Sequence, residues 1–273
     1  MVRVFIMNGK YYISTLEELY EIVNVFSEFK SNNTLIYRAE EYKVGALIPS
    51  LGKVNSNNLR RVEQELLSTM KVYGVPMLGS RAVNEWLLMC LSEQQGFPTR
   101  LLEWTESLFN AIWSVCNSST KDCINIIKVR GRHKASFISS PHHIESTKVF
   151  KASDCDFQEK QKDKWYSIHP FINERNSCIH SLHDEQEYVK DLISINVLPS
   201  VKNNLLKELI SMSELNKTTS NVEEKMTSID FESSSENDLD SQTGEIKDDF
   251  EVNFHDRKLE QYGRKYNQDF DFD

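Results

Sequence analysis

Apolar residues recur every three or four positions along much of the chain, and this period is typical of amphipathic helices. It predicts helices over residues 15–29, 59–72, 81–93 and 106–116. Ser14 and Glu17 have the spacing of a capping box at the start of the first helix. Thr105 is the predicted N-cap of the last helix, because its hydroxyl can accept a hydrogen bond from the backbone there.

Short apolar runs between the helices are rich in β-branched and aromatic residues, which favours strands. They predict strands at residues 35–38, 123–129 and 188–197, and a further helix at residues 200–211. Residues 131–166 are polar without a sustained period, so we expect an insertion or a long surface loop there. The sequence therefore predicts an α+β fold, in which several helices flank a small mixed sheet.

Charge divides the chain into two parts. Residues 231–273 contain thirteen acidic and five basic residues, so this segment carries −8 of the total net charge of −9. Its polar composition cannot offset the entropy of ordering it, so we expect one domain over residues 1–230 and a disordered acidic tail over residues 231–273. Aromatic residues among the carboxylates suit a tail that engages a protein partner, and a purely solubilising tail is the alternative.

The nearly neutral first 230 residues argue against a protein that mainly neutralises phosphate backbones, so nucleic-acid binding stays open without being favoured. Five cysteines without a CxxC pair indicate a reducing compartment. The N-terminus does not resemble a signal peptide, and no apolar stretch is long enough for a membrane span. We therefore expect a cytoplasmic protein without membrane contact. The Cys and His residues between positions 133 and 183 lack the paired spacing of zinc ligands, so no metal is expected.

The most distinctive string of the chain is GFPTRLLEWT, at residues 96–105. In a structural interpretation, the glycine and the proline end the preceding helix, and the apolar residues enter the core. Glu103 would then form an ion pair with Arg100 or Arg38, since guanidinium and carboxylate match in a bidentate geometry. Two further blocks precede this string: YRAE at residues 37–40 and LIPSL at residues 47–51.

These three blocks resemble the FRG domain family. Its members read much like HxGLPTRLLDWT at the main block, with a Phe/Tyr-Arg-Gly motif and a Pro-Ser-Leu string upstream. The order and spacing of the blocks agree with the family through about residue 116. Ala39 stands in place of the motif glycine, and Gln94 stands where many members carry histidine.

The order of the motifs also resembles that of ADP-ribosyltransferase-like folds, in which arginine, serine or threonine, and glutamate follow one another. This resemblance implies NAD as the cofactor, with the cofactor-binding residues Arg38, Tyr37 and Arg100. A guanidinium suits the pyrophosphate, and a carboxylate stabilises the positive charge that develops on the ribose as nicotinamide leaves. The implied catalytic residues are Glu187, Glu185 and Thr105. The charged run HDEQE at residues 183–187 also fits a solvated loop.

Two classes of function follow from these resemblances. The first is an FRG-domain effector with an ADP-ribosyltransferase-like architecture, which would use NAD to modify a macromolecule. Its implied context is antiviral defence or conflict between phage and host. The second is a non-catalytic protein-binding module, in which Ala39 and Gln94 reflect the absence of activity and the acidic tail engages a partner.

Overall fold

The sheet of this protein has eight strands in the part of the chain that the structure describes. The computed structural model describes residues 5–7, 10–27, 33–42, 47–78, 84–155, 163–172 and 178–212. The strands are β1 (Phe5–Met7), β2 (Lys10–Ile13), β3 (Thr34–Glu40), β4 (Leu101–Thr105), β5 (Cys123–Val129), β6 (Lys148–Lys151), β7 (Lys164–Ile168) and β8 (Leu192–Val197). Their order across the sheet is β1-β2-β8-β5-β3-β4-β7-β6. β2 and β8 run parallel and the other neighbouring pairs run antiparallel, which confirms the predicted mixed sheet.

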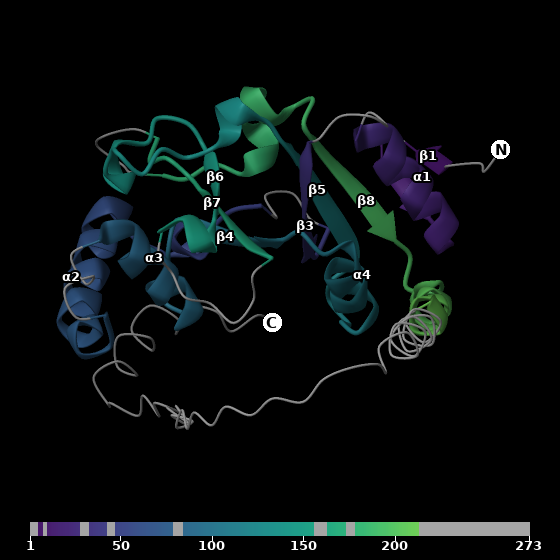
Figure 1. Cartoon of the computed structure of the whole chain (residues 1–273), viewed down its shortest axis with the longest axis horizontal. Helices are drawn as coiled ribbons and strands as arrows, with labels where there is room; N and C mark the ends of the chain where they lie inside the picture. Colours follow the sequence, from purple (N-terminus) through teal and green to yellow (C-terminus); the bar gives the residue numbers. More distant parts are fainter. Residues whose placement is uncertain are drawn as a thin grey trace, which may run out of the picture.

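Helices lie beside both ends of this sheet (Figure 1). They are α1 (Leu16–Ser27), α2 (Leu59–Leu78), α3 (Glu85–Gln94) and α4 (Leu108–Cys116), and residues 202–212 form a further helix. In Figure 1, α2 and α3 lie near β4, β6 and β7, whereas α1 and α4 lie near β5 and β8. The α+β fold with several flanking helices is thus confirmed.

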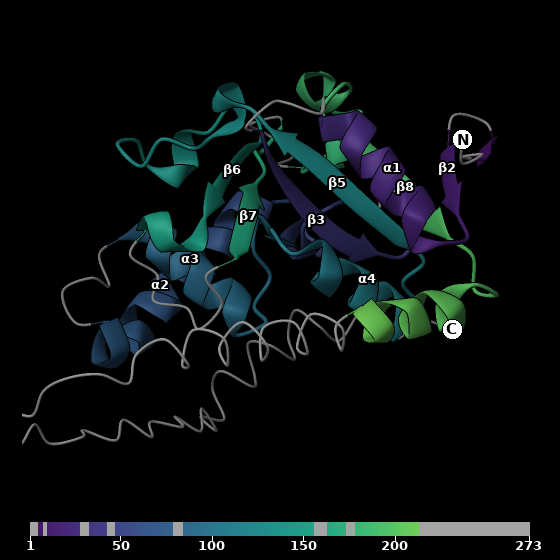
Figure 2. The same cartoon turned by 45° about the vertical axis from the view of Figure 1, so that its right-hand side comes forward.

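β3 pairs very unequally with its two neighbours. All seven of its residues pair with β5, but its register with β4 consists of Tyr37 opposite Thr105. The sheet therefore divides at this pair into β1-β2-β8-β5-β3 and β4-β7-β6. Figure 2 shows β3 and β5 side by side, with β6 and β7 to one side of them. Because β3 and β4 separate on either side of this pair, side chains next to the division can face open space between the two strands.

The alternation of side chains along β5 separates two layers of the core. Ile124 and Ile126 pack in one cluster with α1, α4 and the helix over residues 202–212. Ile127 points the other way and packs in a second cluster with Trp104 of β4. A third cluster joins α2 and α3 to β4, β6 and β7. Each part of the divided sheet is therefore supported by its own set of helices.

Two predicted helix caps lie one or two residues from the observed ones. Thr15, rather than Ser14, caps α1: the backbone N–H of Glu18 donates to Thr15 Oγ1 at 3.2 Å, and Thr15 N–H donates to Glu18 Oε2 at 3.3 Å. The stretch STLEE contains the same spacing twice, so spacing alone does not distinguish the two. Thr105 is the last residue of β4, and the side chain of Ser107 caps α4. The motif GFPTRLLEWT therefore ends in a strand.

The polar segment at residues 131–166 contains β6 and the start of β7. The expectation of a long surface loop is corrected here, because these strands are short and flanked by lysines, so their period is hard to recognise. Residues 156–162 and 213–273 lie outside the described residues, so the predicted domain boundary and acidic tail stay predictions. Among the described helices, none combines the length and apolar character needed to cross a membrane.

Candidate functional site

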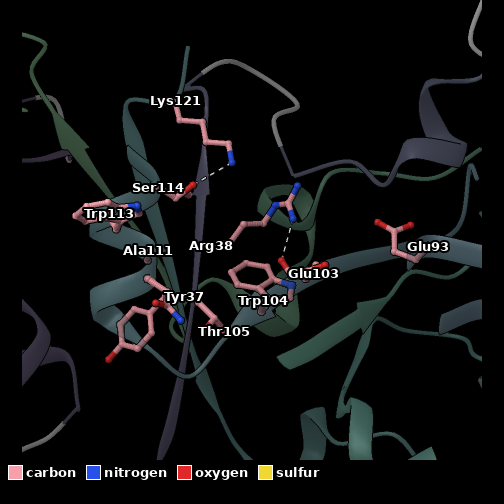
Figure 3. Close-up of a pocket in the computed structure, with 12 residues that line it drawn as sticks. Tyr37, Arg38, Glu93, Glu103, Trp104, Thr105, Ala111, Trp113, Ser114 and Lys121 are labelled. Carbon is pink, nitrogen blue, oxygen red and sulfur yellow. Dashed lines mark hydrogen bonds between the residues drawn. The ribbon is translucent and has the colours of Figure 1, made fainter. Parts of the chain in front are cut away.

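A cavity of about 530 Å³ lies where β3 and β4 diverge. Residues from β3, the C-terminal turn of α3, β4 and α4 line it, together with Lys121 from the loop before β5. Figure 3 shows Arg38 between Trp113 on one side and Glu93 on the other. The cavity thus combines cationic, acidic and aromatic side chains from four elements.

Arg38 is held at the cavity by contacts from both sides of the division. Its Nη1 donates to the backbone oxygen of Glu103 at 2.8 Å, and its Nε and Nη2 contact Glu40 Oε2 at 2.9 and 2.6 Å. The side chain keeps 23% of its surface exposed. A guanidinium has five N–H donors, and the described contacts use one N–H on each of its three nitrogens. N–H groups of Nη1 and Nη2 therefore remain for an anionic ligand. The Arg38 guanidinium is therefore both held in place and accessible to a ligand.

Glu93 is a carboxylate at the cavity that no motif in the sequence indicates. It lies in the last turn of α3 and accepts a short hydrogen bond from Thr99 Oγ1. Burial raises the pKa of Glu93, and the hydrogen bond from Thr99 and the positive charge of Arg38 oppose that rise. A raised pKa makes the ionised carboxylate a better proton acceptor near neutral pH. Its only signal in the sequence is an acidic residue directly before the motif block, which looks like an ordinary polar helix end.

Thr105 and Tyr37, which pair across the division, both line the cavity. The hydroxyl of Thr105 donates to Asp163 Oδ2 at 2.6 Å and accepts from the backbone N–H of Ser107 at 3.0 Å. These contacts give Thr105 a structural task at the turn between β4 and α4. Burial, together with the nearby Tyr20, raises the pKa of Tyr37 to about 12, so its phenol is neutral at physiological pH.

Arg100, the third predicted cofactor-binding residue, is not at the cavity. Its side chain is 1% exposed, and Nε donates to Glu63 Oε1 at 2.7 Å. Nη1 and Nη2 donate to the backbone oxygens of His169 and Pro141, at 2.9 and 3.2 Å. The guanidinium also lies 4.5 Å from the ring centroid of Phe171. A buried ion pair of Arg100 was expected, and its partner is Glu63 of α2 rather than Glu103.

Glu185 and Glu187 lie in the segment before β8, outside the residues that line the cavity. β8 begins at Leu192, which pairs with Ile127 of β5, and Ile127 in turn pairs with Ile36 of β3. Glu185 accepts a short hydrogen bond from the Thr147 hydroxyl, and burial raises its pKa. Glu187 Oε2 lies 3.8 Å from Lys148 Nζ. Neither residue lines the cavity, so their catalytic role stays a prediction without support from this geometry.

Both departures from the family pattern can be placed. Ala39 is half-buried and lines the cavity, so its methyl group occupies space that a glycine would leave open. Gln94 is the exposed last residue of α3 and does not line the cavity. Among the described residues, no group of three or more His, Cys, Asp and Glu side chains could hold a metal ion.

The fold and the site define an α+β protein with a polar cleft at a division of its mixed sheet. Every residue that lines this cleft lies between positions 37 and 121. The family model of the FRG domain matches residues 33–123, so the chain carries an FRG domain and that domain contains the whole cleft. No curated protein and no solved structure matches the chain. Glu185 and Glu187 lie outside the matched segment.

Proposed function

We propose that the FRG domain of this protein binds NAD in the cleft between β3 and β4 and transfers ADP-ribose to a macromolecule. The observation that carries this proposal is the presence of Arg38 and Glu93 at one cavity built entirely from FRG-domain residues. A fixed guanidinium and a carboxylate of raised pKa are the two groups that such a transfer needs most.

Arg38 supplies the anion-binding part of the proposal. The pyrophosphate of NAD carries two negative charges, and a guanidinium binds phosphate oxygens through directed, charge-assisted hydrogen bonds. Lys121 adds a second cation at the cavity, where its Nζ donates to Ser114 Oγ at 3.1 Å. Because the walls hold Arg38 in place, little conformational entropy is lost when the ligand binds.

Glu93 supplies the chemical part. In the proposed reaction the bond between C1′ of the ribose and the nicotinamide nitrogen breaks, and neutral nicotinamide leaves with the electron pair. A lone pair of the acceptor forms the new bond to C1′, and the proton of the acceptor passes to the Glu93 carboxylate. The same carboxylate stabilises the positive charge on the ribose in the transition state. Such acid–base and electrostatic assistance contributes on the order of 100-fold or more to a rate.

The test is nicotinamide release from NAD by the purified full chain, followed by chromatography. We expect wild type and Arg61→Ala to release nicotinamide at the same rate, since Arg61 is an exposed residue of α2. Arg38→Ala should raise KM for NAD, and Glu93→Gln should lower kcat. Absence of release by wild type, with and without candidate acceptor proteins, would contradict the proposal. Loss of activity in Glu187→Gln with full activity in Glu93→Gln would transfer the catalytic role to Glu187.

A non-catalytic binding module is the second candidate, and the placement of Glu185 and Glu187 favours it. A glutamate predicted to act on the ribose does not line the cleft. In this alternative the cleft binds a ligand or a peptide without chemistry, and the chain engages a partner protein. Tight NAD binding without nicotinamide release would support this candidate over the enzyme.

The context of phage defence is part of the same proposal. Cells that express the wild-type chain should resist phage infection, and cells that express Arg38→Ala should not. Equal plaque numbers on both strains at equal protein levels would remove this context without affecting the proposed chemistry.

A further inference from the structure

The exposed side of α4 carries two large aromatic residues beside the cleft. Phe109 and Trp113 retain 41% and 44% of their surface exposed, and their rings stack with centroids 6.2 Å apart at an interplanar angle of 11°. The opposite side of α4 packs Ala111, Ile112 and Val115 into the core. The aromatic pair is therefore not needed to attach the helix, and exposed apolar surface of this kind marks binding sites.

Trp113 belongs to the cleft as well as to this pair, because it lines the same cavity as Arg38 and Lys121. Its indole differs from those of the other tryptophans: Trp86, Trp104 and Trp165 are at most 5% exposed. The ring of Phe109 stacks with the Trp113 indole and so restricts the orientation of the indole. A restricted, exposed aromatic ring next to cations is the arrangement on which nucleobases stack, since every base offers a π-face and phosphates follow close by.

The charges around this rim suit a neutral base. From residue 107 to residue 121 the chain has no acidic residue, and the polar neighbours Asn110 and Ser114 also line the cavity. The carboxylate that contacts this rim, Asp163, accepts hydrogen bonds from Asn110 at 3.3 Å and from Thr105 at 2.6 Å. Figure 3 shows Trp113 and Glu93 on opposite sides of Arg38. A dinucleotide can therefore lie along the cleft with its pyrophosphate at Arg38, one end at Glu93 and the other at Trp113.

We propose that Trp113, backed by Phe109, is the surface on which the adenine base of the ligand stacks, so that the cleft selects adenine dinucleotides over sugar phosphates. This inference rests on the proposed NAD-binding function and adds the residue that determines specificity. Since the reacting ribose would lie at the Glu93 end, Trp113 acts on affinity and not on the bond that breaks.

Calorimetric titration of the full chain with ADP-ribose and with ribose 5-phosphate tests adenine stacking on Trp113 separately from ligand binding in the cleft. Wild type should bind ADP-ribose at least about tenfold more tightly than ribose 5-phosphate, since stacking of one base on an aromatic side chain contributes about that much. Trp113→Ala should lower the affinity for ADP-ribose by about tenfold without changing the affinity for ribose 5-phosphate, and Trp113→Phe should keep most of the affinity for ADP-ribose. Phe109→Ala should weaken ADP-ribose binding by a smaller factor.

The control is Met212→Ala, because Met212 is 44% exposed and lines a different, apolar hollow. We expect this variant to bind both ligands like wild type. Fluorescence gives a second measurement: Trp113 is the exposed tryptophan, so ADP-ribose should quench the emission of wild type and ribose 5-phosphate should not. Circular dichroism of each variant confirms that it is folded.

The outcomes are distinct. If Trp113→Ala weakens both ligands equally, or neither, then base stacking on Trp113 is refuted while NAD binding stands. If wild type binds the two ligands with equal affinity, the same conclusion follows. If wild type binds neither ligand, the proposed function and this inference fail together.

Discussion

Two arginines of the FRG domain lie in opposite kinds of surroundings. The Arg100 side chain is 1% exposed, and its guanidinium is enclosed by Glu63, two backbone oxygens and an aromatic ring. The Arg38 side chain is 23% exposed, pairs with Glu40 and lines the cavity between β3 and β4. Both guanidinium groups have acceptors in the protein. What distinguishes them is whether a ligand can also reach them.

This difference in exposure suggests separate roles for the two motif blocks, YRAE at residues 37–40 and GFPTRLLEWT at residues 96–105. Arg100 lies directly before β4 and pairs with Glu63 of α2, so it ties the part of the sheet formed by β4, β7 and β6 to that helix. Arg38 lies at the edge of the other part and faces the cleft. A motif arginine can therefore serve the fold or the ligand, and burial decides between the two.

The largest expected effect is on Arg100. Arg100→Ala should lower the free energy of unfolding by about 3–5 kcal/mol, because it leaves the buried Glu63 carboxylate without its guanidinium partner and with His142, 3.4 Å away, as its remaining partner. Urea denaturation measures this loss. The double variant Arg100→Met with Glu63→Leu should lose less, since it removes both charges. A stable Arg100→Ala protein with weakened NAD binding would reverse the contrast between the two arginines.

Thr105 should show the next largest effect. Thr105→Val removes the hydrogen bonds to Asp163 and from Ser107, and we expect a loss of about 1–3 kcal/mol. Thr105→Ser should recover most of that stability. Urea denaturation and NAD turnover of both variants check this expectation. Full stability of Thr105→Val together with lost turnover would instead support the predicted catalytic role of Thr105.

Arg38→Ala should change the free energy of unfolding by no more than about 1 kcal/mol, because its ion pair with Glu40 is partly solvated. Its effect should lie in ligand binding. Glu40→Gln is the matched variant: it removes the competing carboxylate, so the affinity for ADP-ribose should rise. A fall in affinity in Glu40→Gln would mean that the negative charge of Glu40, and not only its hydrogen bond, is needed to hold Arg38 in place.

Glu93 should give the smallest effect on stability, visible as a dependence on pH. Because its folded pKa is raised above the ordinary value of 4.5, the folded state favours the protonated form. The contribution of Glu93 to the free energy of unfolding is fully present below pH 4.5 and is lost as the pH rises through the folded pKa. Glu93→Gln does not titrate, so its stability relative to wild type should increase with pH over that range. Gln94→Ala, at the exposed neighbouring position, should show a difference that is independent of pH.

Local patterns predicted much of the fold because they depend on neighbours in the sequence. The helical period gave α1, α2, α3 and α4 to within a few residues at most ends, and the apolar run CINIIKV gave β5. β4 was not expected, since the glycine and proline before it and its own Glu103 resemble a turn. Strands of four or five residues such as β6 carry too short a period to be recognised alone.

The site depends on strand pairing between segments that are distant in the sequence, and local patterns do not predict such pairing. The resemblance in motif order singled out Arg38, Tyr37 and Thr105. All three line the cleft, because β3 and β4 pair at Tyr37 and Thr105. The position of Glu93 follows from how α3 packs against β4. The placement of Glu185 and Glu187 depends on the direction of β8 in the sheet, and the spacing of two glutamates does not specify this direction.

Calorimetric titration with NAD of wild type, Arg38→Ala and Arg61→Ala tests the central claim most directly. We expect saturable binding of one NAD per chain by wild type and Arg61→Ala, and a loss of affinity of at least about tenfold in a folded Arg38→Ala protein. Equal affinity in all three proteins would show that Arg38 and its cleft are not the NAD site.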